Sequence, residues 1–251
     1  MKRMETGRKL LKAGPWGEWF NQDTDQRKKV PPPPLQKPYP ADAKLIDLMA
    51  AKDLTVGQMA LIDAIDRRKS HRRYTAEALT LEELSFLLWA AQGVQEIAKK
   101  GDATRRTVPS GGSRHPFELY LVVNRVNGLE PGLYRYLPLD HKLCFLRADS
   151  ELSKKVTRAC LKQAFVGKGA VVFIWTAFPY RAEWRYTILA HKMIAMDAGH
   201  SCQNLYLASG AIGAGMCAIG AYNQEERDGL LKVDGTDEFT IYAAVAGKIK
   251  S

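Results

Sequence analysis

A long apolar segment in the last third of the chain constrains the fold more than any other feature. Residues 184–212 read WRYTILAHKMIAMDAGHSCQNLYLASGAI. They predict one helix from Trp184 to Ile212, with apolar residues on nearly every side from Ile188 onward. A helix that is apolar all round is buried inside a protein. We therefore expect a long central helix, with the other elements arranged around it.

Short helices and strands are interspersed through the rest of the chain. Thr80 and Glu83 form a capping-box pattern before an apolar stripe that ends at Gly93, which predicts a helix. Further helices are expected over 55–70 and 223–233, the second capped by Asn223. Strands are predicted by branched and aromatic residues over 117–126, 169–178, 215–222 and 237–248, with a hairpin over 133–146. This order predicts an α+β fold with a mixed, mostly antiparallel sheet flanked by helices.

Composition limits the class of protein. The chain has 251 residues, of which 46% are hydrophobic, enough for one large core. Its net charge of +10 favours anionic partners. The four cysteines form no C-x-x-C pair, so we expect reduced, mostly buried thiols in a cytoplasmic protein rather than a zinc site or disulfides. No secretory signal and no membrane span is recognisable, and no membrane association is expected.

The N-terminal segment differs from the rest. We predict a proline-rich arm over residues 1–45 and a main domain over residues 46–251. The string KKVPPPPLQKPYP contains six prolines and favours an extended, polyproline-like conformation. Two interpretations stay open: a disordered tail, or an arm laid across the body or across a second subunit. In a free tail, the large aromatic side chains of Trp16, Trp19 and Phe20 would stay exposed to water, which disfavours that interpretation.

The string DRRKSHRRYT concentrates more positive charge than any other part of the chain. It is either a solvated basic turn or a binding site for an anion. Arg68 and Arg72 flank Ser70, and arginine with serine makes charge-assisted contacts suited to phosphate. Cations are also favourable near a helix C-terminus, so part of the run can be purely local structure.

Two glycine-containing segments are further candidates. In RTVPSGGSRHP, glycines allow backbone N–H groups to approach a ligand closely, although no Walker lysine follows. In GAGMCAIGAY, glycines bracket a short apolar strand, and the amides of Gly220 and Ala221 could donate to a ring heteroatom of a flat ligand. Each segment alone is equally consistent with an ordinary turn.

Taken together and in this order, these strings resemble the nitroreductase family, and within it the SagB/ThcOx-type dehydrogenases. RRKSHRRY is similar to the family's R-x-S-x-R-x-[FY], and RTVPSGGSRHPFELYLVV to P-S-[AG]-G-x-x-x-P-x-E-x-Y. LTLEELSFLLWAAQGV is similar to the family's next helix, and GLEPGLYRY and DAGHSCQNLYLASGAIGAGMCAIGAY to strings of the SagB-like branch. The resemblance covers about Leu45 to Lys248.

The resemblance implies the nitroreductase fold, bound FMN, and a homodimer with FMN at the subunit interface. It places the basic run at the phosphate, ribityl chain or pyrimidine edge of FMN, where a cation stabilises the reduced flavin. The glycine loop would line the ribityl chain or ring edge, and Gly220 and Ala221 would offer an amide to flavin N5. Lys248 would close the phosphate site. The implied cofactor-binding residues are Arg68, Lys69, Ser70, Arg72, Pro109, Ser110, Gly111, Gly112, Ser113, Gly220, Ala221 and Lys248; of these, Lys69 is expected to face the surface or a partner.

The sequence departs from the family pattern at two places. Azoline-oxidising members carry a Lys-Tyr pair where this chain has Arg185 and Tyr186, the two predicted catalytic residues. Arginine stays protonated and is a poor general base, whereas Tyr186 could act as an acid. SRHP replaces the family's ALYP and brings Arg114 and His115 near the active site. Arg114 would bind an anionic substrate or a nicotinamide-cofactor phosphate, or be a surface charge.

The implied activity is an FMN-dependent oxidoreductase of ping-pong type, acting on a small molecule with NAD(P)H or an organic substrate as hydride donor. One alternative is a non-catalytic FMN-binding carrier or sensor, which the replacement at Arg185 favours. The other is a nucleic-acid binder using residues 67–73 and 105–106, although no recognition-helix motif supports nucleic acid as a partner. We expect a stand-alone module with no metal site. The spacing of His191 and His200 does not suit a metal, and His200 is expected to form a buried or interface hydrogen bond.

Overall fold

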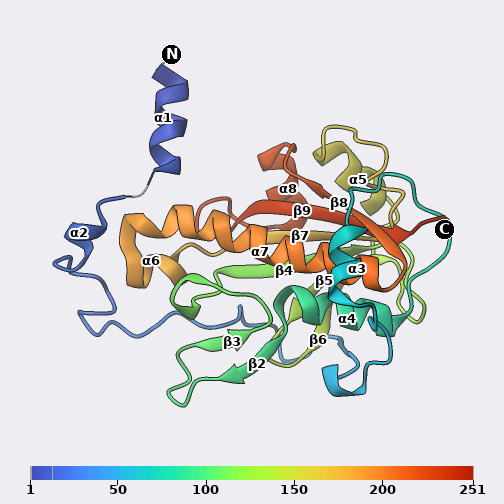
Figure 1. The fold of residues 1–251 in the computed structure, drawn as a ribbon, viewed down its shortest axis with the longest axis horizontal. Helices are drawn as coiled ribbons and strands as arrows, with labels where there is room; N and C mark the ends of the chain where they lie inside the picture. Colours follow the sequence, from blue (N-terminus) through green and yellow to red (C-terminus); the bar gives the residue numbers. More distant parts are fainter. Residues whose placement is uncertain (1, 13, 251) are drawn as a thin grey trace.

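The computed structural model describes residues 2–12 and 14–250. Its strands are β1 (Leu45–Asp47), β2 (Val94–Ile97), β3 (Thr104–Arg106), β4 (Phe117–Val123), β5 (Gly132–Leu137), β6 (Lys142–Arg147), β7 (Val171–Ala177), β8 (Ala214–Ile219) and β9 (Phe239–Lys248). Among the described residues, seven strands form one sheet in the order β1-β6-β5-β4-β7-β9-β8, and β2 pairs with β3 (Figure 1). Neighbouring strands pair in antiparallel fashion throughout the large sheet. The predicted α+β class and mostly antiparallel sheet are confirmed.

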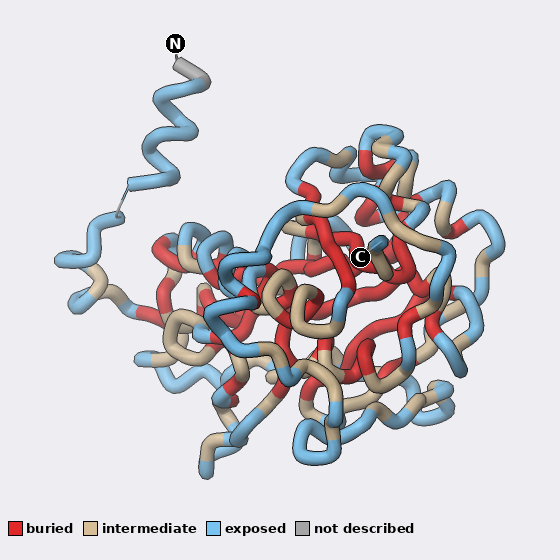
Figure 2. The backbone as a smooth tube through the Cα atoms, turned by 45° about the vertical axis from the view of Figure 1, so that its right-hand side comes forward, coloured by how far each residue is buried: buried red, intermediate tan, exposed pale blue. Residues whose placement is uncertain are grey.

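Helices cover both faces of this sheet. The helices of the described residues are α1 (Lys2–Leu11), α2 (Trp16–Trp19), α3 (Leu61–Asp66), α4 (Leu81–Gln92), α5 (Leu152–Ala159), α6 (Tyr180–Tyr186), α7 (Ala190–Ala211) and α8 (Gln224–Leu231). Helices α4 and α7 pack on one face, and α5 and α8 pack on the other, each over a separate hydrophobic cluster. Figure 2 shows the buried backbone concentrated in the sheet and α1 projecting from the body.

Ser201 fixes α7 to its surroundings. This side chain is completely buried, and its Oγ donates a hydrogen bond to the Ala91 carbonyl at 2.7 Å. The same oxygen accepts from Trp175 Nε1 at 2.9 Å and from Gln92 Nε2 at 3.1 Å. One hydroxyl therefore joins α7 to α4 and to β7. A buried hydroxyl with all its partners contributes stability and fixes the register of the packed elements.

The long predicted helix exists, but it starts later and is less central than expected. Thr187 adopts a φ of 50°, which ends α6 at Tyr186, and α7 begins at Ala190. Only one side of α7 is buried; Met196, on the outer side, is 52% exposed. The expectation of burial all round is wrong for the single chain, because the sheet and α4 cover only that one side.

Sequence signals at element ends are mostly confirmed. Thr80 and Glu83 form the capping box of α4, Gly93 follows its last residue, and Asn223 caps α8. The predicted hairpin corresponds to β5 and β6. The helix expected over 55–70 is wrong in length, because α3 contains only six residues. Gly57 precedes it with a φ of 82° and lies against the Phe86 ring, where a Cβ would come within 2.5 Å.

The proline-rich arm lies along the body of the same chain. Trp184 Nε1 donates to the Val30 carbonyl at 2.9 Å, and Arg181 Nε donates to the Pro34 carbonyl at 2.8 Å. Arg135 Nη2 donates to the Pro38 carbonyl at 2.9 Å. An extended proline-rich strand has unpaired carbonyls, and these side chains satisfy several of them.

A buried ion cluster lies beneath the arm. Glu118 is 2% exposed and accepts from Arg181 Nη2 at 2.5 Å and from the Lys37 backbone N–H at 2.7 Å. Arg135 Nη1 approaches the same carboxylate at 4.0 Å. Lys37 also pairs with Glu238, a buried carboxylate that accepts from the Tyr120 hydroxyl at 3.0 Å. Charges this deeply buried depend on one another, since removing one leaves its partners uncompensated.

We predict that Glu118→Gln lowers the free energy of unfolding by about 3–5 kcal/mol, because two buried guanidinium groups lose their counterion. Urea unfolding measures this loss. The matched control is Glu130→Gln, since Glu130 pairs with Lys44 at 2.6 Å on the surface with 46% of its side chain exposed. That change should alter stability by about 1 kcal/mol or less. Equal losses in the two variants would contradict the structural role of Glu118.

Candidate functional site

The basic run leaves α3 and passes along β8. Ser70 forms an isolated bridge with Met216, and the His71 N–H donates to the Met216 carbonyl at 2.8 Å. The Ser70 and Tyr206 hydroxyls share a hydrogen bond of 2.8 Å, and the Ala218 N–H donates to the Tyr206 oxygen at 2.9 Å. Tyr206, on α7, thus holds the run against β8.

The charges of the run are uncompensated. Within the described chain, none of the basic side chains from 67 to 73 forms an ion pair. Arg68, Lys69, Ser70 and Arg72 are all exposed. Arg68 lies over the Tyr206 ring at 5.4 Å, and Arg72 lies over the Phe165 ring at 5.7 Å. Exposed, aromatic-supported guanidinium groups beside an exposed serine suit an oxyanion.

Three other predicted cofactor residues lie near this run. Gly220 and Ala221 are exposed just beyond the end of β8, where the Ala221 carbonyl accepts from Gln163 Nε2 at 3.0 Å. Lys248 lies on β9, paired with the first residue of β8. Its ammonium donates to Glu83 and, at 3.3 Å, to the Ile212 carbonyl. The Lys248 charge is therefore already balanced by the carboxylate of the α4 capping box.

Asp197 on α7 organises the glycine loop. Its carboxylate accepts from Ser110 Oγ at 2.6 Å and from the Gly111 N–H at 3.2 Å, and Ser110 Oγ accepts from the His115 N–H at 2.9 Å. Burial raises the pKa of Asp197, and the hydrogen bonds from Ser110 and Gly111 oppose that shift. Ser113 turns with a φ of 55°. Pro109 precedes this turn and is exposed.

The two glycines of the loop allow close packing. A Cβ on Gly111 would lie 2.0 Å from Met193 Cε, so a side chain there would require the end of Met193 on α7 to move. Gly112 has a φ of 60°, and a Cβ on it would lie 2.5 Å from the Tyr186 hydroxyl and 3.0 Å from Arg185 Cδ. Glycine is thus required both for the left-handed turn and for the contact with the end of α6.

The predicted catalytic residues end α6, against this loop and beneath the N-terminal arm. Tyr186 is 8% exposed, and the rings of Trp16 and Trp19 lie 6.0 Å and 5.7 Å from it. Trp19 Nε1 donates to the Arg185 carbonyl at 3.1 Å. Arg185 Nε is buried without a hydrogen-bond partner among the described residues. The arm therefore covers Tyr186 and orders the backbone of Arg185.

Arg114 and His115 are structural parts of the loop. Arg114 is 7% exposed and donates to the Asp102 carbonyl at 2.7 Å and to the Gly112 carbonyl at 3.1 Å, so it is not the surface charge allowed by the sequence. The His115 ring is hydrogen-bonded to the Thr104 carbonyl at 3.1 Å. Burial, helped by the nearby Arg106 charge, lowers the pKa of His115 to about 3. His115 is therefore neutral at physiological pH.

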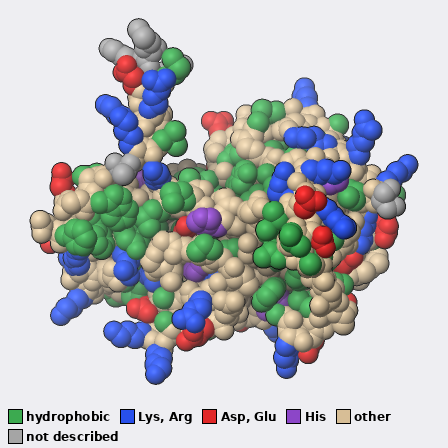
Figure 3. All heavy atoms as spheres, viewed as in Figure 1, with side chains coloured by type: hydrophobic (Ala, Val, Ile, Leu, Met, Phe, Trp, Pro, Cys, Tyr) green, Lys and Arg blue, Asp and Glu red, His purple; other side chains and the backbone are tan. Residues whose placement is uncertain are grey.

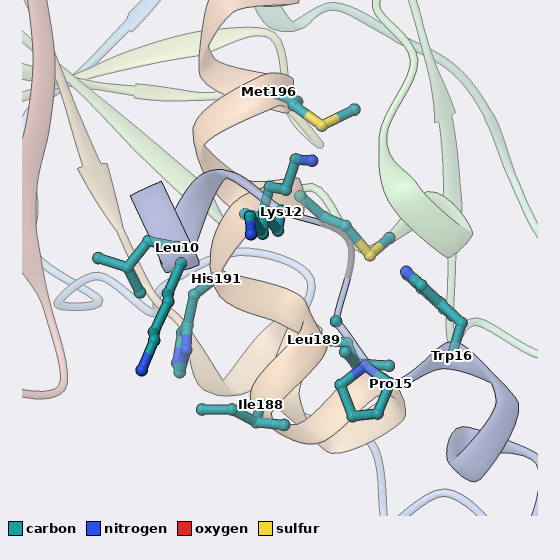
Figure 4. Close-up of a pocket in the computed structure, with 12 residues that line it drawn as sticks. Leu10, Lys12, Pro15, Trp16, Ile188, Leu189, His191 and Met196 are labelled. Atoms are coloured by element: carbon teal, nitrogen blue, oxygen red, sulfur yellow. The ribbon is translucent and has the colours of Figure 1, made fainter. Parts of the chain in front are cut away.

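A cavity of about 330 Å³ opens beside this loop, at the start of α7 (Figure 4). Met193, which touches Gly111, contributes to its wall. The remaining wall combines apolar side chains with amino groups and one imidazole. Its lining residues are Lys9, Leu10, Lys12, Gly14, Pro15, Trp16, Ile188, Leu189, His191, Lys192, Met193 and Met196. Such a wall suits an apolar small molecule with a negative charge.

Asp197 and Tyr206 received no role from the sequence, yet they hold the loop and the basic run. The available signal was a single carboxylate in an otherwise apolar stretch of helix. Tyr206 lies nine positions after Asp197, which corresponds to about 13.5 Å along α7 and about half a turn around its axis. The two parts of the candidate site therefore lie on opposite flanks of one helix.

The remaining histidines and thiols contribute no recognisable ligand set. His200 is on the outer side of α7, with 46% of its side chain exposed, so a buried hydrogen bond is wrong in the single chain. His191 Nε2 lies 2.7 Å from Glu183 Oε1. All four cysteines are buried and free. Over residues 2–12 and 14–250, no group of three potential ligand side chains is placed to hold a metal, and no helix is long and apolar enough to span a membrane.

Comparison with known proteins identifies relatives of this arrangement. The chain is 33% identical over 187 residues to a nitroreductase homologue of Methanocaldococcus jannaschii, covering 74% of this chain and 91% of that protein. It is 32% identical over 142 residues to the trifolitoxin-processing protein TfxB of Rhizobium leguminosarum bv. trifolii, covering 54% of this chain and 38% of that protein.

Solved structures share the fold. A nitroreductase homologue from Ralstonia eutropha is 27% identical with a TM-score of 0.67, covering 88% of this chain and 100% of that chain. One from Anabaena variabilis is 25% identical with a TM-score of 0.70, covering 86% of this chain and 43% of that chain. The NADPH:FMN oxidoreductase of Vibrio harveyi, 17% identical with a TM-score of 0.54, shares the fold over 76% of this chain and 69% of its own.

The family model of the nitroreductases matches residues 65–248, which include the basic run, the glycine loop, α7 and the strand of Lys248. The match extends over well more than half of the chain, and the fold agrees with it. The chain belongs to the nitroreductase family.

Proposed function

We propose that this protein is an FMN-dependent oxidoreductase that transfers hydride between a donor and a small-molecule acceptor. The observation that supports it most is the uncompensated basic run, held at β8 by the Ser70–Tyr206 hydrogen bond. Family membership and the likeness to an NADPH:FMN oxidoreductase support a flavin. We include a cytoplasmic location in the proposal, because all four thiols are free.

The residues present fit FMN in their chemistry. Arg68 and Arg72 carry unpaired charges for a phosphate or for the anionic edge of a reduced flavin, with the Ser70 hydroxyl between them. The backbone N–H groups beyond β8, at Gly220 and Ala221, are exposed to a flat ligand. Lys248 would contribute only part of its charge to the phosphate, because its ammonium is already paired with Glu83.

We also propose a homodimer that completes the flavin site. Since the loop and the basic run lie on opposite flanks of α7, one flavin touches both most simply if two subunits contribute. Exposed apolar side chains continue this outer face: Leu61 is 66% and Ile62 is 77% exposed on α3. Figure 3 shows apolar side chains gathered on the surface in the region of α3. Large exposed apolar patches mark interaction sites. In a dimer they would bury the outer side of α7.

Bound FMN would supply hydride acceptance and donation at N5, with NADPH, NADH or an organic molecule as the donor. The chain would bind the cofactor, orient the substrate over it and exclude water. Arg185 would supply a fixed positive charge beside the loop, with an unused Nε donor. Tyr186 would position Gly112 and, through its hydroxyl, could give up a proton.

We propose membership in the SagB/ThcOx-type branch within the family. Similarity to a trifolitoxin-processing protein supports it. The E. coli microcin synthetase complex McbBCD, 16% identical with a TM-score of 0.61, supports the shared fold over 99% of this chain. Arg185 in the lysine position of azoline oxidases weakens a general-base role there. A second candidate function is an FMN-binding carrier or sensor. It is favoured because the rings of Trp16 and Trp19 cover Tyr186.

We predict that the double variant Arg68→Ala, Arg72→Ala retains much less FMN. Each charge-assisted contact contributes about 1.5–3 kcal/mol, so the dissociation constant should rise at least about tenfold. FMN titration followed by fluorescence measures it. The matched control is Arg67→Ala, Arg73→Ala, which removes the same charge from the same exposed run. If both doubles bind FMN alike, the phosphate site lies elsewhere.

We predict that Ser110 mainly stabilises the fold, whereas Ser113 mainly contributes to FMN binding. Ser110→Ala removes the hydrogen bonds to Asp197 and from His115, and should lower the unfolding free energy of the flavin-free protein by about 1–3 kcal/mol. Ser113→Ala should change that stability by about 0.5 kcal/mol or less and weaken FMN binding about two- to tenfold. Chemical denaturation and FMN titration measure the two effects. A stability loss at Ser113 as large as at Ser110 would contradict this division.

A further inference from the structure

A second charged cavity lies on the face of the sheet opposite α7. It has a volume of about 340 Å³ and lies between the proline-rich arm, strands β4 to β6 and the end of α8. Its lining residues are Lys37, Pro38, Tyr39, Pro40, Tyr120, Arg135, Cys144, Leu146, Arg147, Leu231 and Lys232. They include four cations and no aspartate or glutamate. We propose that this cavity binds a small molecule through a phosphate group, at a site separate from the flavin.

The floor of the cavity is a row of side chains across the sheet. Arg135 pairs with Tyr120 on β4 and with Cys144 on β6, so the three side chains share one face. Tyr120 belongs to the hydrophobic cluster under α5 and α8, which identifies that face as the one opposite α7. The cavity lies over β4 to β6, whereas the basic run lies along β8, the strand at the opposite edge of the sheet.

The cations converge on the cavity from four separate parts of the chain. Lys37 comes from the arm, Arg135 and Arg147 come from adjacent strands, and Lys232 follows α8 with a φ of 57°. Arg147 donates from Nη2 to the Leu230 carbonyl at 2.6 Å, which ties β6 to the end of α8. Cations that approach from several directions match the several oxygens of a phosphate better than one planar carboxylate.

The surrounding carboxylates balance only part of these charges. Glu118 pairs closely with Arg181, and Glu238 pairs with Lys37. Arg147 and Lys232 form no ion pair within the described part of the chain. Two lining cations are thus outside any ion pair of the described residues, although the charge of Arg147 helps to lower the pKa of Asp149.

Arg135, a buried lining cation, also has an unsatisfied hydrogen-bond donor. The residue is 3% exposed, its carboxylate contact is as long as 4.0 Å, and its Nε has no hydrogen-bond partner among the described residues. Within residues 2–12 and 14–250, its guanidinium forms one hydrogen bond, from Nη2 to the Pro38 carbonyl. A buried guanidinium ordinarily satisfies its donors, so an anion in the cavity would supply the hydrogen-bond acceptor that the chain does not.

The test uses the full-length protein with FMN at saturating concentration, which keeps phosphate out of the proposed flavin site. Inorganic phosphate is titrated calorimetrically in chloride buffer of constant ionic strength. We expect one saturable site. The variant Arg147→Gln, Lys232→Asn should weaken it at least tenfold; asparagine tolerates the left-handed backbone at 232. The control Lys154→Gln, Lys162→Asn removes two charges outside the cavity, one also from a left-handed position with a φ of 58°. It should bind phosphate like the parent.

Absence of saturable binding by the parent would overturn the proposal, as would equal weakening in the two double variants. Loss of the phosphate site in Arg68→Ala, Arg72→Ala, with the cavity intact, would assign the binding to the basic run and also overturn it. None of these results depends on whether the protein catalyses hydride transfer. Failure of the flavin proposal would appear separately, as missing FMN binding in the parent.

Discussion

One buried hydroxyl determines where both parts of the candidate site lie. Ser201 connects α7 to α4 through Ala91 and Gln92, and to the sheet through Trp175. These contacts fix the rotation of α7 and its position along its axis. Asp197 then lies toward the glycine loop, and Tyr206 lies toward the basic run. A rotation of α7 would break both contacts together, so the register set by the core is also the register of the site.

Local signals predicted much of the fold. The capping box at Thr80, the cap at Asn223 and the hairpin strands follow from short-range chemistry that the sequence displays directly. Long-range partners were not predictable in this way. No sequence signal near Lys248 indicates that its ammonium pairs with Glu83. None near Arg114 indicates that its guanidinium donates to two backbone carbonyls. Gly57, which precedes α3, lies against the Phe86 ring, which is again a tertiary contact.

The N-terminal arm links the two faces of the molecule. Near its start, Trp16 and Trp19 cover Tyr186 beside the glycine loop. Further along, Lys37 enters the buried ion cluster of Glu118 and Glu238 and lines the second cationic cavity. The composition of the arm predicted an extended chain, but its position depends on arginines that donate to its carbonyls from α6 and β5. Cofactor chemistry on one face and anion binding on the other would therefore share one covering segment.

The most direct measurement is the visible absorption spectrum of the purified protein, recorded anaerobically as NADPH and then NADH are added. We expect a flavin band that one of the two nucleotides bleaches, because the basic run and the loop are proposed to hold FMN with N5 open to a donor. A band that neither nucleotide bleaches would leave only an organic donor or the carrier function. A protein that shows no flavin band, even after incubation with FMN, would contradict the proposed cofactor and with it the proposed reaction.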